Sequence, residues 1–347
     1  MTGRTAEQPE APVIRRLHLN ESPLPPAPGV VAAIADAATR LNRYPEPDSE
    51  RLLDALAAYS GVSANRIIVT SGSNELLHLL PLIAGAHGAE MVVPDPSFPT
   101  YRKVAGFFDI KVHAVPVAAD GRPDVDALLA AVTPGCRMVC VPSPNNPTGG
   151  LLEAEEIERL VAGVPDTMLL HFDEAYYEFG RQAGGVEALL LLEKRSGPWM
   201  TSRSFSKAFG LAGLRLGYTI ACTAELAARA RALRPNFSVN ALAMAAGAAA
   251  LDVPEHMQAT VAQVSGERRR LSDGLAAAGL APFPSAANFV AFPIPAGDGD
   301  LAARLASLGI LTTAFNIPGH GAAIRITVGT SEDTDAFLAA LSSCRAG

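Results

Sequence analysis

Lys207 lies in a segment whose residue types suit covalent binding of an aldehyde. Residues 204–210 read SFSKAFG, and Arg215 follows shortly after. A lysine amine condenses with an aldehyde to form a Schiff base, small residues let the backbone approach a flat ligand, and a guanidinium offers paired donors to a phosphate. Ser206 can add a hydroxyl. The segment therefore predicts a lysine that binds pyridoxal phosphate; the alternative is a surface lysine in a Gly/Ala loop.

Asp173 is a second candidate, because it ends the apolar run at residues 168–172. Open α/β sheets bind ligands at the carboxyl ends of their strands. A carboxylate there can keep the pyridine nitrogen of the cofactor protonated through a charge-assisted bond worth roughly 1.5–3 kcal/mol. Tyr176 can reach the phenolic oxygen of the ring. Alone, Asp173 is equally well explained as a cap of the next turn; together with Lys207 it favours the cofactor site.

Three further motifs suit the same cofactor. Residues 142–149 read PSPNNPTG, a rigid turn in which Asn146 can donate to the phenolic oxygen. Ser73 and Asn74 open an expected helix, where backbone N–H groups bind anions such as phosphate. Phe98 can stack on the pyridine face. Each feature alone is also explained by an ordinary turn, an ordinary helix start or a core phenylalanine.

Arg325 is a charged residue inside the apolar run at residues 323–328. Such a residue is rarely buried unless it meets an anion. We expect it to clamp a substrate carboxylate through two parallel hydrogen bonds; the alternative is a structural ion pair. Phe98, Phe237, Phe315 and Ile317 are candidates for an apolar side-chain pocket, or equally for the core.

Short β-branched runs alternate with alanine-rich helical patterns from about Val30 to Ala250, which is typical of crossover units around a mostly parallel sheet. We expect an α/β fold with three parts: an N-terminal arm (1–29), a large domain with seven strands (30–250) and a smaller C-terminal α/β domain (251–347). The expected strands of the large domain are 66–70, 91–93, 111–115, 138–141, 168–172, 199–202 and 216–220. A capping box at residues 330–333 announces the last helix.

Bulk properties exclude several classes of protein. The chain has 347 residues, a hydrophobic content of 49% and a net charge of −7, with no Lys/Arg-rich run, so nucleic acid is not an expected partner. The four cysteines show no metal-binding spacing, and we expect reduced thiols and no metal site. Residues 1–11 are polar and contain no apolar core of a signal peptide, and no stretch approaches the roughly 18 consecutive apolar residues of a membrane span. We therefore expect a cytoplasmic enzyme.

Taken together, these motifs resemble the fold-type-I pyridoxal-phosphate aminotransferases, and within them the histidinol-phosphate aminotransferase group. The resemblance runs from about Leu19 to the C-terminus. It is carried by LNESP at 19–23, RYP at 43–45, SGSNE at 71–75, PNNPTG at 144–149, DEAY at 173–176, the lysine segment at 204–218 and RITVG at 325–329.

The resemblance implies a role for each matching residue. Lys207 would form the Schiff base and move the proton, and Arg325 and Asn20 would contact the substrate. The expected cofactor shell comprises Ser73, Asn74, Phe98, Asn146, Asp173, Tyr176, Ser204, Ser206, Lys207 and Arg215. Tyr44 would reach the cofactor phosphate of a neighbouring subunit, which implies a homodimer with shared active sites.

The chain also departs from the histidinol-phosphate group. That group has an arginine for the substrate phosphate where this chain has Thr313, and the group's N-terminal Pro-Tyr element is missing from residues 5–14. Arg15 and Arg16 are the remaining cations that could replace them. We therefore expect a non-phosphorylated amino acid as substrate, with histidinol phosphate as the alternative.

The expected reaction is a ping-pong transamination between an L-amino acid and a 2-oxoacid, in which Lys207 moves the α-proton. A decarboxylase or other lyase on the same scaffold is the main rival. A transcription regulator would need a DNA-binding domain, and only residues 1–29 precede Val30. A nicotinamide dehydrogenase would need a G-x-G-x-x-G motif after a first strand, which is absent.

Overall fold

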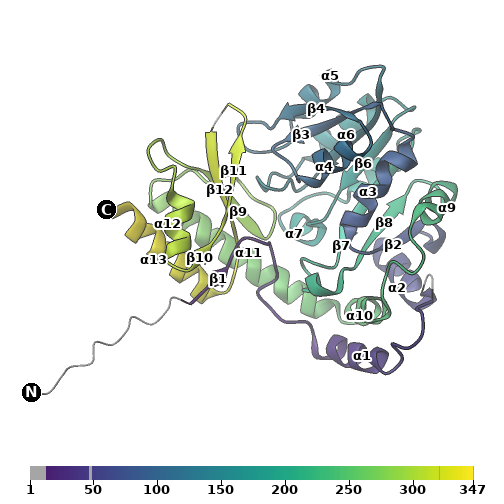
Figure 1. Cartoon of the computed structure of the whole chain (residues 1–347), viewed down its shortest axis with the longest axis horizontal. Coiled ribbons are helices and arrows are strands. Elements are labelled where there is room, and N and C mark those ends of the chain that lie inside the picture. Colours follow the sequence, from purple (N-terminus) through teal and green to yellow (C-terminus); the bar gives the residue numbers. More distant parts are fainter. Residues whose placement is uncertain (1–12, 47–48, 320, 347) are drawn as a thin grey trace, which may run out of the picture.

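The computed structural model describes residues 13–46, 49–319 and 321–346. Residues 1–12 of the expected arm, which include most of the segment compared with the Pro-Tyr element, lie outside this part of the chain. Figure 1 shows two bodies of unequal size joined by the long helix α11 and crossed by the N-terminal segment.

A seven-stranded sheet forms the larger body, with strand order β2-β8-β7-β6-β5-β3-β4. Strand β8 is antiparallel to both of its neighbours, and every other pair is parallel. All seven expected strands are confirmed, each with bounds shifted by a few residues. They are β2 (Ile67–Thr70), β3 (Glu90–Asp95), β4 (Lys111–Pro116), β5 (Cys136–Pro142), β6 (Leu169–Asp173), β7 (Trp199–Ser204) and β8 (Gly217–Ala221).

Helices cover both faces of this sheet, which explains why most of its strands are continuous apolar runs rather than alternating ones. In β2, for example, Ile68 belongs to the core cluster that includes residues of α3, α4 and α9, whereas Ile67 and Val69 belong to the cluster that includes residues of α2, α6 and α10. The helices on and around the sheet are α1 (Pro28–Ala38), α2 (Glu50–Ser60), α3 (Ser73–Ala84), α4 (Thr100–Phe107), α5 (Val125–Ala130), α6 (Ala154–Gly163), α7 (Tyr177–Gln182), α8 (Ala188–Leu192), α9 (Ala224–Leu233) and α10 (Ala241–Leu251), with short 3₁₀ turns at Ala64–Arg66 and Ala212–Leu214.

The smaller body contains an antiparallel sheet of order β11-β12-β9. Its strands are β9 (Phe289–Pro293), β11 (Thr313–Ile317) and β12 (Gly321–Thr327), and its helices are α11 (Pro254–Ala277), α12 (Leu301–Ser307) and α13 (Ser331–Ala346). The expected capping box is present, since Thr330 N–H donates to Asp333 Oδ2 and Asp333 N–H donates to Thr330 Oγ1. The domain boundaries at residues 29/30 and 250/251 stay a prediction.

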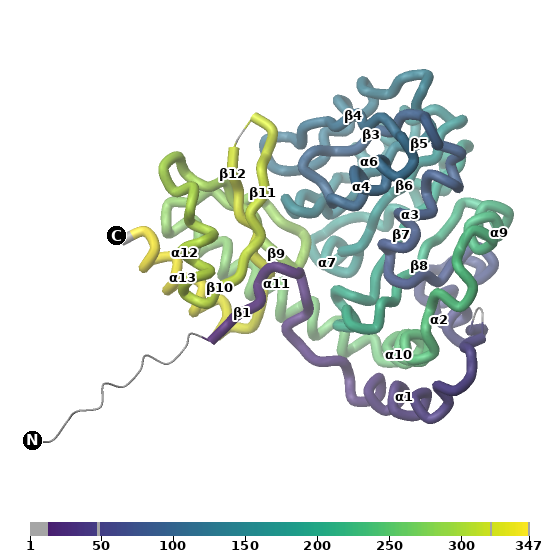
Figure 2. The backbone as a smooth tube through the Cα atoms, in the orientation of Figure 1, coloured from purple at the N-terminus to yellow at the C-terminus, as the bar shows by residue number. Residues whose placement is uncertain are grey.

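The N-terminal segment connects the two bodies. Strand β1 (Arg15–Arg16) pairs in parallel with β10 (Ile310–Leu311) of the smaller body, and the chain then runs to α1 on the larger one. Figure 2 shows this path, in purple, passing in front of α11. Residues 18–21 therefore lie between the two sheets, next to the strand ends that carry the expected site.

Candidate active site

A cavity of about 460 Å³ lies where the carboxyl ends of β5, β6 and β7 meet the N-terminal segment and β12. Its location follows the rule for open α/β sheets. Twelve of the expected site residues line it, namely Asn20, Ser73, Asn74, Phe98, Asn146, Asp173, Tyr176, Ser204, Ser206, Lys207, Arg215 and Arg325. These residues come from seven separate segments of the sequence, and the fold brings them to one place.

Lys207 follows β7, and its amine faces the cavity. The Nζ atom donates to the carbonyl oxygens of Asn20 at 2.9 Å and of Leu19 at 3.3 Å. Burial lowers the pKa of Lys207 to about 8, and the positive charges of Arg325 and Arg215 act in the same direction. A larger fraction of the amine is therefore neutral and nucleophilic at neutral pH than for an exposed lysine.

Asp173 ends β6 and is 6% exposed. Its Oδ2 atom accepts from the hydroxyl of Tyr101 at 2.8 Å, and its Oδ1 atom accepts from Ser202 Oγ at 3.2 Å and from Ala175 N–H at 3.0 Å. A carboxylate with this many donors is held in one orientation. The arrangement suits a group that faces a protonated ring nitrogen.

Tyr176 and Asn146 present polar groups to the same cavity. The hydroxyl of Tyr176 accepts from Asn20 Nδ2 at 2.9 Å, so its own proton remains for a ligand. Asn146 Oδ1 accepts from Arg325 Nη1, an orientation in which Nδ2 serves as the donor to a ligand. Both groups therefore have a donor available for one phenolic oxygen, and that role stays a prediction.

Arg325 is 9% exposed and pairs with no carboxylate among the described residues. Its Nη2 atom donates to the carbonyl oxygen of His18 at 2.6 Å and to Thr313 Oγ1 at 3.1 Å. Its Nε atom is buried with no partner in the described part of the chain. The structural ion pair that was the alternative for Arg325 is thus absent among the described residues. Its buried guanidinium lines the cavity without a carboxylate partner in that part of the chain.

The expected phosphate cup is built around the start of α3. Gly72 has φ 71° and ψ 160°, and a Cβ atom there would lie 2.6 Å from Nη2 of Arg215. Glycine is thus needed for Arg215 to reach the N-terminus of α3, where Ser73 and Asn74 begin the helix. The Arg215 guanidinium next to the first N–H groups of a helix fits a phosphate dianion.

Tyr44 is the one expected site residue outside the cavity. Its side chain is 81% exposed and stacks on Phe237, with ring centroids 4.6 Å apart. Phe237, Phe315 and Ile317 do not line the cavity either, so Phe98 is the one member of that apolar set that does. The prediction that Phe237, Phe315 and Ile317 line an apolar side-chain pocket was therefore wrong for the cavity of a single chain.

Arg15 and Arg16 also lie elsewhere than the cavity lining. Arg15 Nη1 pairs with Asp333 Oδ1 at 2.5 Å, and Arg16 pairs with Glu21 at 3.5 Å. Neither guanidinium lines the cavity, so neither replaces the phosphate-binding arginine that the histidinol-phosphate group has where this chain has Thr313.

Sequence reasoning missed Tyr101, His18 and the role of Ser202. Tyr101 lies in α4 and looks like a core aromatic residue in the sequence, and no local pattern links it to Asp173. His18 lies in the arm, and its Nδ1 atom is buried without a partner in the described part of the chain. The available signal was the run of polar residues, Thr201 to Ser204, in β7, a strand whose residues are all buried.

Comparison with known proteins identifies the family of this chain. The family described as aminotransferase class I and II matches residues 14–341. The chain belongs to the class I and II aminotransferases. Similar relatives include an aromatic amino acid aminotransferase of Rhodococcus opacus (strain B4), 40% identical over 331 residues, covering 95% of this chain and 90% of the relative. A histidinol-phosphate aminotransferase 2 of Caulobacter vibrioides is 35% identical over 326 residues, covering 94% and 85%.

A solved structure shares the fold of this aminotransferase. The histidinol-phosphate aminotransferase of Sinorhizobium meliloti, in complex with pyridoxal-5′-phosphate, superimposes with a TM-score of 0.89 at 31% identity, over 96% of this chain and 90% of the other. The expected fold-type-I α/β fold, the enzyme class and the cofactor are therefore confirmed. In the described part of this aminotransferase, each helix is too short or too polar to span a bilayer.

The residues of this aminotransferase fit pyridoxal phosphate. Bound there, the cofactor supplies an aldehyde for an amine and a protonated ring that withdraws electrons. Lys207 would provide the amine, Asp173 a carboxylate for the ring nitrogen, and Tyr176 and Asn146 the donors to the phenolic oxygen. Arg215, Ser73, Asn74, Ser204 and Ser206 surround the space for the phosphate. The individual roles of these residues stay predictions.

Proposed function

We propose that this aminotransferase moves an amino group from an L-amino acid with a free α-carboxylate to a 2-oxoacid, and that its preferred donor carries an apolar or aromatic side chain. The observation that carries this proposal is Arg325, a buried guanidinium in the cavity without a carboxylate partner among the described residues. A substrate carboxylate supplies the missing anion. The same arginine would receive the carboxylate of the 2-oxoacid in the second half of the reaction.

The chain's own groups then divide the work. Arg325 binds and orients the carboxylate, which places the α-carbon of the substrate near Lys207. Lys207, with its pKa lowered to about 8, is neutral often enough to take the α-proton, and it would return that proton to the former aldehyde carbon of the bound cofactor. Asp173, held by Tyr101 and Ser202, faces the electron-withdrawing ring and keeps its nitrogen protonated.

Thr313 argues against a phosphorylated substrate. Its hydroxyl donates to the carbonyl oxygen of His18 at 2.9 Å and accepts from Arg325, so it belongs to the carboxylate site and adds no charge. Among the residues lining the cavity, Lys207, Arg215 and Arg325 are the lysine and arginine side chains. Each is already assigned to the cofactor or to the carboxylate. The names of the relatives at 40% identity point to an aromatic donor.

We also propose that the active enzyme is a homodimer in which Tyr44 completes the partner's cofactor site. Two exposed, stacked aromatic rings, Tyr44 and Phe237, support an interface at this place, because such rings are enriched in interfaces. Mixing inactive Lys207→Ala and Tyr44→Ala proteins should restore activity, since one site of the mixed dimer would be intact. If neither mixing nor co-expression restored activity, the shared site would be contradicted.

A cytoplasmic location, expected from four free cysteines, stays a prediction.

The decisive experiment is a donor screen with the purified holoenzyme. L-phenylalanine, L-tyrosine, L-leucine, L-aspartate and histidinol phosphate would each be paired with 2-oxoglutarate and with pyruvate, and kcat/KM measured. We expect the aromatic donors to give the highest values and histidinol phosphate a value at least about tenfold lower, since one missing charged contact is worth roughly 1.5–3 kcal/mol. A preference for histidinol phosphate would refute the substrate class, and release of carbon dioxide without amine transfer would favour a decarboxylase.

A further inference from the structure

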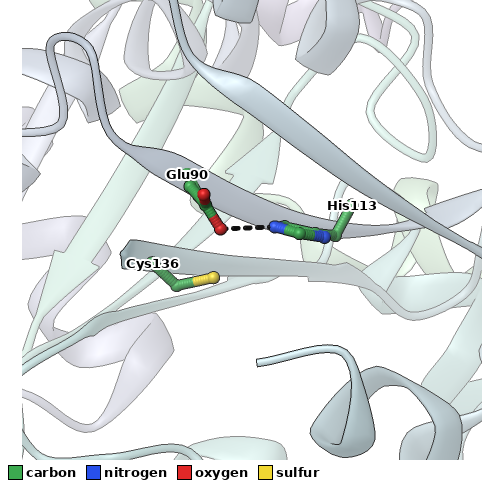
Figure 3. A group of neighbouring side chains, drawn as sticks. All are labelled: Glu90, His113 and Cys136. Atoms are coloured by element: carbon green, nitrogen blue, oxygen red, sulfur yellow. Dashed lines mark hydrogen bonds and ion pairs between the residues drawn. The ribbon is translucent and has the colours of Figure 1, made fainter. Parts of the chain in front are cut away.

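Three potential metal ligands meet at the edge of the seven-stranded sheet opposite the cavity. They are the carboxylate of Glu90 on β3, the imidazole of His113 on β4 and the thiol of Cys136 on β5, and one ligand atom of each lies within 4.8 Å of the other two. Figure 3 shows the carboxylate and the imidazole pointing at each other with the Cys136 sulfur beside them. Glu90 Oε2 and His113 Nε2 are 2.6 Å apart.

Strand register places these side chains on one face. Glu90 pairs with Lys111 of β4 and with Cys136 of β5, and His113 lies two residues beyond Lys111, on the same face of its strand. The pairing of β3 with β5 shifts between Glu90 and Met91, because Met91 pairs with Met138. In a regular register Arg137 would lie opposite Glu90. This irregularity brings Cys136 beside the carboxylate instead, and bulges often re-aim a side chain in this way.

Neighbouring side chains and backbone groups hold the Glu90 and Cys136 side chains in place through hydrogen bonds. Thr133 Oγ1 donates to Glu90 Oε2 at 2.6 Å, Lys111 Nζ donates to Oε1 at 3.2 Å, and the N–H of Thr133 points at Cys136 Sγ at 3.4 Å. Thr133, Lys111 and His113 therefore all direct polar groups at the Glu90 carboxylate and hold it in one orientation. Ligands braced by outer hydrogen bonds are typical of metal centres.

We propose that Glu90, His113 and Cys136 bind one zinc ion, with water as the fourth ligand. One oxygen, one imidazole nitrogen and one sulfur form a donor set that suits this borderline cation. Bonds of about 2.0–2.3 Å in a tetrahedron place ligand atoms roughly 3.3–3.7 Å apart, which needs shifts of about 1 Å here. On binding, Cys136 releases its thiol proton to solvent and His113 binds as the neutral ring.

The fourth position is open to solvent, because the side chains of Glu90 and His113 are 23% and 21% exposed. Cys136, by contrast, is fully buried. The site lies away from the catalytic groups, since Cys136 and Pro142 are the two ends of β5 and Pro142 lines the cavity. Seven residues of strand span roughly 20 Å. We therefore infer a structural role, in which the ion ties β3, β4 and β5 together.

The test uses cobalt(II) as the probe on chelator-treated holoenzyme. Wild-type protein should show a sulfur-to-cobalt absorption band that saturates at one cobalt per chain, read as a difference from the Cys136→Ser holoenzyme so that cofactor absorption cancels. Zinc should displace the cobalt and raise the Tm. His113→Asn should weaken binding by more than the roughly 10–100-fold typical of an outer residue, and Thr133→Val should weaken it within that range.

Cys222→Ser is the matched control, because Cys222 is a free cysteine outside this cluster. It should retain the cobalt band and the rise in Tm. Transaminase activity of the Cys136→Ser and His113→Asn proteins reports that both are folded. Absence of the band in wild-type protein, an unchanged band in His113→Asn or loss of the band in Cys222→Ser would each overturn the proposal.

Discussion

Arg325 donates a hydrogen bond from Nη1 to Oδ1 of Asn146, although the two residues lie 179 positions apart. The bond joins β12 of the smaller sheet to the turn after β5 of the larger one. The arginine is the expected carboxylate ligand, and the asparagine is the expected donor to the cofactor. With these roles, a direct bond between them would fix the position of the substrate relative to the cofactor ring, which a proton transfer at one defined carbon requires.

Replacing Arg325 by lysine should lower kcat/KM for L-amino acids roughly 30-fold, which corresponds to a loss of about 2 kcal/mol in transition-state stabilisation. The ammonium of lysine is a point charge. It cannot keep the bonds to His18, Thr313 and Asn146 while it holds both carboxylate oxygens. Steady-state kinetics with one donor and 2-oxoglutarate would measure this. Arg270→Lys on α11, whose guanidinium pairs with Glu267 and Asp335, is the control and should be near wild type. Equal losses in both variants would refute a specific role of Arg325.

Capture of pyridoxal phosphate by the apo-enzyme should accelerate as pH rises toward about 8 and level off above it. Burial, Arg325 and Arg215 lower the pKa of Lys207 from 10.5 to about 8, and only the neutral amine attacks an aldehyde. The sign follows because a lowered lysine pKa makes the neutral form dominant above pH 8. Stopped-flow growth of the Schiff-base absorption between pH 6 and 10, a window that spans the value of about 8, would measure the midpoint.

The Arg325→Met enzyme provides the comparison for this midpoint. Removing a nearby positive charge should move the midpoint upward, whereas burial should keep it below 10.5. A wild-type rate that still rises steeply at the upper end of this pH range would show that the amine is exposed in solution.

Tyr101→Phe should reduce kcat by roughly tenfold or more with little change in KM for the amino donor. The substitution removes the hydroxyl that donates to Asp173 Oδ2 at 2.8 Å, and an unsatisfied buried acceptor costs about 1–3 kcal/mol. Loss of this hydrogen bond would disturb the orientation of Asp173, whose expected partner is the cofactor rather than the substrate. Tyr59→Phe, which removes a donor to Glu178 at 3.3 Å, is the matched control. A rise in KM with constant kcat would instead place Tyr101 among the substrate ligands.

Gly72→Ala should weaken the affinity for pyridoxal phosphate by roughly tenfold or more. A residue other than glycine is destabilised by about 1–3 kcal/mol at the φ of 71° and ψ of 160° that Gly72 adopts. The new Cβ atom would also push Arg215 away from the start of α3. Spectroscopic titration of the apo-enzyme with the cofactor would give the Kd. Gly266→Ala on α11, with open space at its Cβ position, should leave the Kd unchanged. An unaltered Kd for Gly72→Ala would remove the case for a phosphate cup there.

Much of the site could be predicted because its residues follow strand ends. Parallel strands bring their carboxyl ends to one edge of the sheet, so Asn146, Asp173 and Lys207 were expected together before any contact was known. Tyr101 escaped notice because a buried tyrosine in a helix carries no local mark of its partner, which lies 72 positions away. Tyr44 matched a motif, yet its expected role depends on a second chain.

Local patterns in this chain, namely apolar runs, glycine turns and short motifs at strand ends, were sufficient for the α/β class, the seven strands and the lysine that meets an aldehyde. They could not reveal that Arg325 meets Asn146 and no carboxylate of the described chain, nor that Glu90, His113 and Cys136 converge. Such meetings depend on which strands lie side by side and in which register. A shift of one residue turns every side chain to the other face, and register is set by packing of the whole molecule.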